Sequence, residues 1–223
     1  SKIAKDNDLF VIEDAAHAIG SQYLDGTYVG NCKYSDLTTF SFHPVKTITT
    51  GEGGAITTNS KDLYERLLML RSHGITKDEN KLSMNPGPWY YEMQELGFNY
   101  RLTDIQAALG SSQLSRLNEF KARRREIVAL YNRSFKDANW LTVPFEVEGL
   151  SSCFHLYVLL IDFQAIGKSR AEVMAELLSE GVGTQVHYIP ITQLPYYAKT
   201  HNEKLHNAQS YYGRCLSIPL YPD

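Results

Sequence analysis

Residues 37–58, LTTFSFHPVKTITTGEGGAITT, decide the fold of this 223-residue chain. The first six residues of the stretch, 37–42, have the β-branched and aromatic content of a strand, and residues 54–58 have the same character. A turn rich in threonine and glycine separates the two segments, and Lys46 stands directly before it. The pattern therefore predicts two strands joined by a turn that follows a lysine.

The segments on either side of this stretch extend the prediction to an α/β domain. Upstream, the apolar run 9–12 ends in Glu13 and Asp14 and is typical of a buried strand. Downstream, residues 62–71 carry leucines at helical spacing behind Ser60, a residue suited to cap a helix. Strands that alternate with a helix indicate an α/β architecture.

The rest of the chain predicts a connection, two linking helices and a smaller α+β domain. Residues 73–101 are polar and aromatic without a clean period, and connections of that length tend to be functional. The predicted elements that follow are helices at 103–117 and 119–135, a strand at 153–161, a helix at 169–180, a strand at 184–187, a helix at 205–215 and an apolar run at 216–219. We therefore expect a partial large domain at 1–118, an interdomain helix at 119–136 and a small C-terminal α+β domain at 137–223.

Composition and charge exclude several classes of protein. The chain is 43% hydrophobic and 21% charged, with a formal net charge of -3, so it has no broad basic field for nucleic acid. Three widely spaced cysteines, Cys32, Cys153 and Cys215, suit neither a disulfide framework nor a metal site. No run approaches the roughly 18 apolar residues of a membrane span, and the first residues lack a signal-peptide pattern. We expect a cytoplasmic protein without metal.

Three features in the first half of the chain combine into one chemical hypothesis. Asp14 follows a strand, Ser41 and Lys46 follow another, and glycines come next; each feature alone is commonly structural. A pyridoxal 5'-phosphate site needs a lysine for the covalent link, an acid facing the pyridine nitrogen and a donor for the phosphate. Lys46, Asp14 and Ser41 supply one candidate for each role, and Lys46 would also move the substrate proton.

The same residues resemble the DegT/DnrJ-type nucleotide-sugar aminotransferases. The similar segments are DAAHA at 14–18, SFHPVK at 41–46, TGEGG at 50–54, LRSHG at 70–74, LGFNYRLTDIQAAL at 96–109, the Arg123–Arg125 helix and GVGTQVH at 181–187, so nearly the whole chain is covered. The resemblance implies fold type I, the aspartate aminotransferase-like architecture of enzymes that depend on pyridoxal phosphate. It also implies transaminase activity.

Site residues follow from this resemblance position by position. Lys46 would carry the covalent bond to the cofactor, Asp14 would contact the ring nitrogen, Ser41 the phosphate and His17 the phenolic oxygen. Asn99 matches a residue that reaches the cofactor phosphate of the neighbouring subunit, which implies a homodimer with shared active sites.

Predictions about the substrate rest on similarity to one branch of the family. The segments 41–54, 71–76 and 88–93 most resemble the PseC-like branch, which aminates C4 of a UDP-linked 4-keto-6-deoxy-N-acetylhexosamine for pseudaminic acid, usually with L-glutamate as donor. Arg101 is a candidate diphosphate contact, since a guanidinium matches phosphate geometry. His187 and Tyr188 are candidate contacts to the nucleotide sugar.

Two alternatives stay open at this point. Family members carry a sizeable segment before the Asp14 strand, so we expect the chain to be a fragment, and a truncated dimerising or ligand-binding module without catalysis is one alternative. The other is a related sugar dehydratase, a branch in which histidine replaces the lysine. Lys46 argues against the dehydratase.

Overall fold

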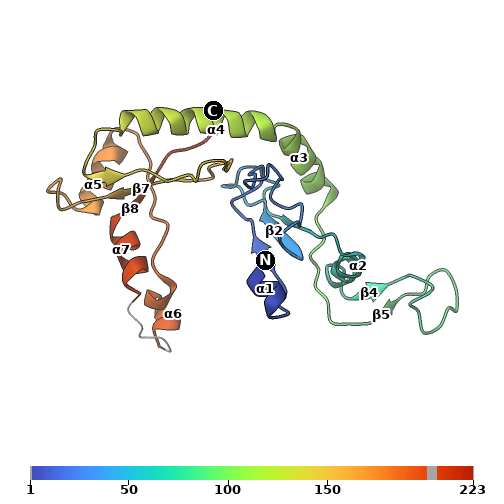
Figure 1. The fold of residues 1–223 in the computed structure, drawn as a ribbon. Coiled ribbons are helices and arrows are strands. Elements are labelled where there is room, and N and C mark those ends of the chain that lie inside the picture. The colour runs from blue at the N-terminus through green and yellow to red at the C-terminus, as the bar shows by residue number, and fades with distance from the viewer. Residues whose placement is uncertain (1, 200–204, 223) are drawn as a thin grey trace. The chain divides into compact units, whose positions relative to one another are not determined.

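The computed structural model describes residues 2–199 and 205–222 of the chain (Figure 1). It divides into two compact units, Ser1–Leu117 and Asn118–Asp223. Each unit has its own three-stranded sheet, and the first unit also has a two-stranded one. The predicted three-part division into domains stays a prediction for the whole protein. Within the described ranges, every helix is too short or too polar to cross a bilayer.

The sheet of the first unit contains β1 (Ile12–Asp14), β2 (Leu37–Ser41) and β3 (Gly54–Thr57), in that order. β1 pairs with β2 in parallel, and β3 pairs with β2 antiparallel. The structure thus confirms the two strands predicted on either side of the Lys46 turn.

The predicted buried strand at 9–12 is wrong in place and in burial. The strand begins only at Ile12; before it, Leu9 and Phe10 are exposed, with Phe10 80% accessible, and Val11 is half-buried. β1 is an edge strand that pairs with β2 alone among the described residues, so nothing there covers Phe10. An apolar run predicts burial only when a second layer is available to pack on it.

The helices of the first unit begin where the sequence predicts a cap. After the short α1 (Lys2–Asp6), α2 (Lys61–Leu70) starts behind Ser60, whose hydroxyl accepts a hydrogen bond from the Leu63 amide. α3 (Asp104–Ser115) starts behind Thr103, which forms a reciprocal capping box with Gln106. Side-chain oxygens satisfy amides that have no partner inside the helix, which is why both predicted starts are confirmed.

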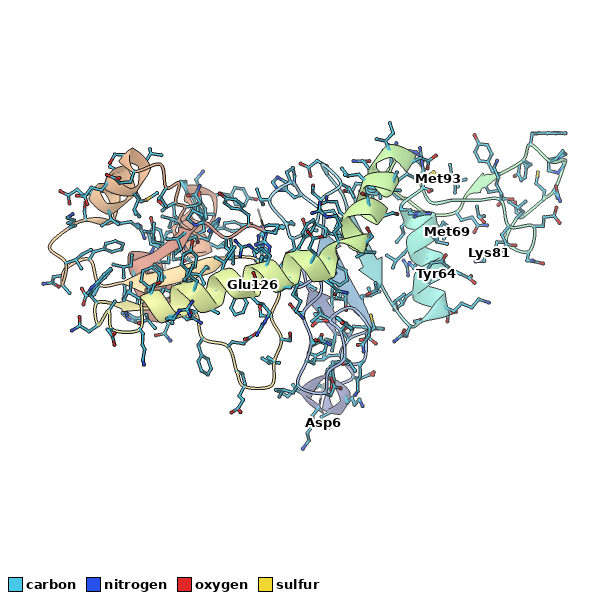
Figure 2. All side chains as sticks on the ribbon, turned by 90° about the horizontal axis from the view of Figure 1, so that it is seen from above. Asp6, Tyr64, Met69, Lys81, Met93 and Glu126 are labelled. Atoms are coloured by element: carbon cyan, nitrogen blue, oxygen red, sulfur yellow. The ribbon has the colours of Figure 1, made fainter. Side chains whose placement is uncertain are left out.

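The segment 73–101 is ordered by a small hairpin for which the sequence has no clear period. It consists of β4 (Ile75–Thr76) and β5 (Glu92–Met93), paired antiparallel. Figure 2 labels Tyr64 and Met69 along α2, and Lys81 and Met93 on the hairpin segment. Lys81 Nζ lies 2.6 Å from Glu65 Oε2 on α2, which fastens the long hairpin loop to that helix.

The second unit is a three-stranded antiparallel sheet with helices. Its elements are α4 (Leu117–Ser134), β6 (Leu141–Thr142), β7 (Tyr157–Ile161), α5 (Arg170–Ser179), the 3₁₀ helix η1 (Ile191–Gln193), α6 (Pro195–Ala198), α7 (His206–Arg214) and β8 (Cys215–Ile218). The strand order is β6-β7-β8. Tyr157, Leu159 and Leu216 from the sheet pack with Val128 of α4 into one core. The predicted α+β character of this half is therefore observed.

Two strand predictions in this unit need correction. The strand predicted from Cys153 begins at Tyr157, because Phe154 has a φ of 49° and breaks the extended backbone. The strand predicted at 184–187 is reduced to a single bridge between Gln185 and Ser217.

Ser169 provides a first testable prediction. Its hydroxyl accepts from the Glu172 amide and the Glu172 carboxylate accepts from the Ser169 amide, so both ends of the capping box of α5 are formed. Ser169→Ala is expected to lower the free energy of unfolding by about 1 kcal/mol, measured by urea denaturation. Ser179→Ala, in the last turn of the same helix, removes only a hydroxyl that donates back to Glu176 and serves as control. Equal effects of the two substitutions would contradict the capping role.

Candidate functional site

The strand register places Asp14 and Ser41 on one face and at one edge of the first sheet. Asp14 lies opposite Thr39 in the parallel pair of β1 and β2, so these two side chains point to the same face. Ser41 is two residues beyond Thr39, and side chains two apart on a strand share a face. Both residues end their strands, and parallel strands present their carboxyl ends at the same edge, where α/β sheets bind ligands.

The opposite face of β1 is occupied by a polar cluster. Glu13 Oε2 accepts a hydrogen bond of 3.1 Å from Thr38, which is fully buried, and its Oε1 accepts one from Tyr23. Burial raises the pKa of the Tyr23 phenol, and the hydrogen bond to Glu13 raises it further, so the phenol keeps its proton and remains a donor. This anchoring fixes the face of β1 from which Asp14 projects.

Asp14 begins a tight turn at the end of β1. Its Oδ1 accepts a hydrogen bond of 3.0 Å from the Ala16 amide, and its side chain is exposed. Asp14 thus stabilises the turn, as an isolated aspartate at the end of a strand commonly does. Its carboxylate still has lone pairs that can accept from a second donor. His17, the predicted neighbour of the cofactor's phenolic oxygen, lies in the same turn and is exposed.

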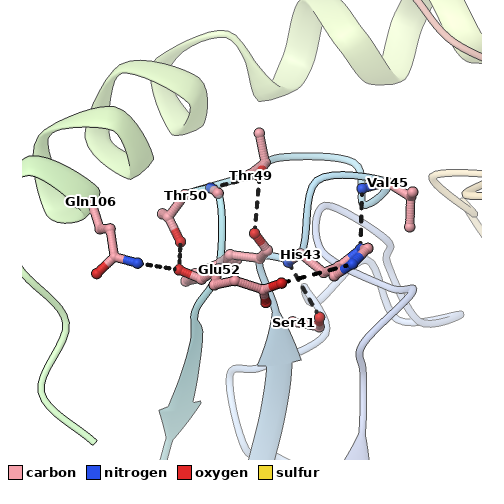
Figure 3. A network of polar contacts seen from close by, with 9 residues as sticks. Ser41, His43, Val45, Thr49, Thr50, Glu52 and Gln106 are labelled. Carbon is pink, nitrogen blue, oxygen red and sulfur yellow. Dashed lines mark hydrogen bonds and ion pairs between the residues drawn. The ribbon is translucent and has the colours of Figure 1, made fainter.

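The turn that carries Lys46 is held by a dense set of hydrogen bonds (Figure 3). The Lys46 amide donates to His43 O at 2.9 Å, and the Thr50 amide and Thr49 hydroxyl both donate to Phe42 O at 3.0 Å. Thr47, Ile48 and Thr50 are buried. The backbone around Lys46 is therefore held in place, and Lys46 itself is a half-buried residue.

Glu52 joins this turn to helix α3. Its carbonyl oxygen accepts from the Thr50 hydroxyl at 2.7 Å and from Gln106 Nε2 at 2.8 Å (Figure 3). Its carboxylate lies 3.9 Å from His43 Nε2, and the side chains of both residues are exposed. The sequence did not single out Glu52 or Gln106 as site residues. The spacing Thr103-x-x-Gln106 could have indicated the capping box, but nothing local indicates the contact to Glu52.

Gly54 closes the turn at a point where the backbone leaves no room for a side chain. A Cβ built there would lie 2.5 Å from Phe40 O on the neighbouring strand. Gly54→Ala is therefore expected to displace β3 from β2 and to lower the free energy of unfolding by about 2 kcal/mol. Urea denaturation followed by circular dichroism measures the change.

Gly213→Ala provides the matched control for this substitution. Gly213 lies in α7 with open space at its Cβ position, so alanine there should stabilise the chain by about 0.5–1 kcal/mol. Unchanged stability in Gly54→Ala would show that the strand pair tolerates the methyl group.

Asn99 and Arg101 lie in the same unit, on the segment that leads into α3. Asn99 is exposed and its backbone bridges Ser72 just after α2. Arg101 lines an open groove of about 1100 Å³ together with side chains of α2, β3 and Gln106. The lining of this groove, as far as the described residues go, does not include Asp14, Ser41 or Lys46. The groove does include Thr39 of β2 and Glu52 of the Lys46 turn, so it adjoins the two segments that carry the predicted cofactor contacts.

His187 and Tyr188 belong to the second unit. His187 Nδ1 lies 2.8 Å from Ser217 Oγ of β8, which fixes the imidazole ring, and Tyr188 is exposed. Their role in binding a nucleotide sugar stays a prediction, as do the roles of Arg101 and Asn99.

The donor set at the sheet edge suits pyridoxal phosphate. Asp14 can accept from a protonated ring nitrogen, the Ser41 hydroxyl can donate to a phosphate, and Lys46 offers a primary amine. Within residues 2–199 and 205–222, no group of three or more His, Cys, Asp or Glu side chains could hold a metal ion.

Comparison with known proteins identifies a family of aminotransferases. Residues 1–223 match the model of the DegT/DnrJ/EryC1/StrS aminotransferase family. A UDP-4-amino-4,6-dideoxy-N-acetyl-beta-L-altrosamine transaminase of Campylobacter jejuni is 39% identical over 224 residues, which are 100% of this chain and 56% of the relative. The chain spans about half the length of the curated relatives it matches.

Solved structures confirm the predicted fold type I. Helicobacter pylori PseC, an aminotransferase involved in pseudaminic acid biosynthesis, superimposes with a TM-score of 0.87 at 33% identity, over 100% of this chain and 57% of PseC. The sugar aminotransferase Spr1654 of Streptococcus pneumoniae, described as putative and solved in its PLP form, gives a TM-score of 0.82 at 30% identity, over 99% of this chain and 55% of its own.

Proposed function

Because the chain belongs to the DegT/DnrJ/EryC1/StrS aminotransferase family, we propose that it forms part of an enzyme that transfers an amino group to a nucleotide-linked keto sugar with pyridoxal 5'-phosphate as cofactor. One observation carries the proposal. Asp14 and Ser41 share a face at the carboxyl edge of the sheet, and Lys46 follows in a hydrogen-bonded turn after β2. A lysine, an acid and a hydroxyl at one sheet edge are what this cofactor requires.

Each residue has a defined task in the proposed reaction. The cofactor, when bound, supplies a conjugated ring that takes up the electron pair released when a C–H bond beside nitrogen breaks. The Asp14 carboxylate accepts the hydrogen bond of the pyridine N–H and keeps that proton on the ring. The Ser41 hydroxyl donates to the phosphate. The Lys46 amine would hold the cofactor covalently, and as a free amine it would take the proton from the substrate carbon that bears the nitrogen.

The finer assignment is amination at C4 of a UDP-linked 4-keto-6-deoxy sugar, with L-glutamate as donor, for pseudaminic acid or a related surface glycan. Relatives support it: the Campylobacter jejuni protein is named as a UDP-sugar transaminase, and the Helicobacter pylori protein acts in pseudaminic acid biosynthesis. We assign Arg101, His187 and Tyr188 to the nucleotide sugar and His17 to the phenolic oxygen of the cofactor. Asn99 would contact the cofactor phosphate of a second subunit in a homodimer.

A turnover assay tests this proposal. The protein, in the full length that its gene encodes, is incubated with ¹⁵N-glutamate and with UDP-, dTDP- or GDP-linked 4-keto-6-deoxy sugars. The products are identified by mass spectrometry. Transfer of ¹⁵N to the UDP-linked sugar in preference to the others is expected. Preference for a dTDP- or GDP-linked sugar would overturn the finer assignment.

The same assay separates the two alternatives. A sugar dehydratase would give a product that has lost the elements of water and carries no ¹⁵N. A binding module without catalysis would show bound cofactor and no product. Either result would contradict the proposed amino transfer.

A further inference from the structure

Gln106 uses its whole side-chain amide to join two segments of the first unit. Its Oε1 accepts from the Thr103 amide at 3.1 Å and from the Thr103 hydroxyl at 2.9 Å, while its Nε2 donates to Glu52 O at 2.8 Å (Figure 3). The partners fix the orientation of the amide, because the Thr103 amide needs an acceptor and the Glu52 carbonyl needs a donor. Glutamine is suited to both tasks at once.

A second contact brings α3 against the same turn. Gly110 lies one helical turn after Gln106, so both face the same side of α3. A Cβ at Gly110 would lie 2.9 Å from Thr50 Cγ2. Thr50 in turn donates to the Glu52 carbonyl. The helix therefore approaches the Lys46 turn closely at two points, and at one of them Gln106 contributes a directed hydrogen bond.

We propose that Gln106 is a positioning residue for the proposed reaction: through Glu52 it holds the Lys46 turn, and through Thr103 it ties that turn to the segment bearing Asn99 and Arg101. The inference rests on the proposed function. Because the amide holds Glu52, loosening it changes the position of the lysine relative to Ser41, the proposed phosphate contact of the same subunit. Small misplacements of reacting groups lower turnover more than they lower binding.

Gln106→Glu separates this role from helix capping. A carboxylate at the third helical position still accepts from the Thr103 amide and suits the helix dipole, but it cannot donate to the Glu52 carbonyl. The unfolding midpoint should therefore stay within a few degrees of wild type. Amide hydrogen exchange of the peptide covering residues 47–54 should become about 10-fold faster, because the turn loses a hydrogen bond. The kcat should fall about 10-fold with KM for the keto sugar unchanged.

Thr103→Ala is the matched control, since it removes the capping hydroxyl and leaves the Gln106–Glu52 bond. It should lower the unfolding midpoint by about 4 °C without changing exchange in residues 47–54. Thr50→Val removes the other donor to the same carbonyl and keeps the Cγ2 methyl group that faces Gly110 of α3. It should reproduce the faster exchange of Gln106→Glu, so the inference remains testable if the glutamate variant does not fold.

Two outcomes would overturn the inference. One is wild-type exchange in residues 47–54 for both Gln106→Glu and Thr50→Val. The other is faster exchange with unchanged kcat, which would make Gln106 structural only. Failure of the proposed function can be told apart from these outcomes, because the wild-type protein itself would then show no amino transfer. The hydrogen-exchange measurement would still test the Gln106 inference, which unchanged exchange in both variants would contradict.

Discussion

Replacing Lys46 by alanine is expected to lower amino transfer by a factor on the order of 10⁵, because one amine both attaches the cofactor and moves the substrate proton. The absorbance of lysine-bound cofactor near about 420 nm should disappear at the same time. Turnover with ¹⁵N-glutamate and an absorbance spectrum of the protein mixed with pyridoxal phosphate measure the two effects. Circular dichroism should be unchanged, since the turn is held by backbone groups and the Thr49 hydroxyl.

Two variants serve as controls for Lys46. Lys46→Arg keeps the positive charge but cannot form the covalent bond, so it should lose the band as alanine does. Lys33→Ala removes an exposed lysine that pairs with Asp25, and it should keep both the band and the turnover. A 420 nm band that persists in Lys46→Ala and vanishes in Lys33→Ala would show that Lys46 is not the lysine that binds the cofactor.

Arg124→Ala should lower the free energy of unfolding by about 3 kcal/mol. Arg124 is only 4% exposed, and its Nη1 donates to the carbonyls of Leu220 at 2.7 Å and of Phe154 and His155 at 3.3 Å. Each orphaned carbonyl costs about 1–3 kcal/mol. Burial lowers the pKa of Arg124, which means that the buried charge itself is penalised, and its removal offsets part of that cost. Urea denaturation measures the balance.

Arg123→Ala is the matched control, one residue earlier on α4. Its guanidinium pairs with Glu126 at 3.0 Å between side chains that are both largely exposed. Such a pair contributes below about 1 kcal/mol because solvent screens it. If alanine at 123 destabilised the chain as much as alanine at 124, the role of the buried carbonyl contacts would be refuted.

Local pattern predicted the elements whose signals lie within a few residues of each other. The two strands around the Lys46 turn and the starts of α2 and α3 are as expected, since a cap or a β-branched run acts over one turn or one strand. The run 9–12 was misjudged because burial depends on a second layer that the run does not contain. Phe154 was misjudged because its left-handed backbone leaves no trace in composition.

The sequence by itself predicted the chemistry that we propose for Lys46. The order of Asp14, Ser41 and Lys46 between two strand patterns and a glycine turn was sufficient to predict the cofactor class, and resemblance added the fold type that solved structures confirm. These properties depend on residue types and short spacings, which the amino-acid sequence gives directly.

Only the tertiary structure decided what holds that lysine in place. Gln106 lies 54 residues from Glu52, and the hydrogen bond between them exists because α3 packs on the Lys46 turn. Likewise, one of two adjacent arginines is buried and the other exposed, because successive residues on a helix point about 100° apart. Contacts between distant segments depend on how elements pack, and no short spacing encodes them.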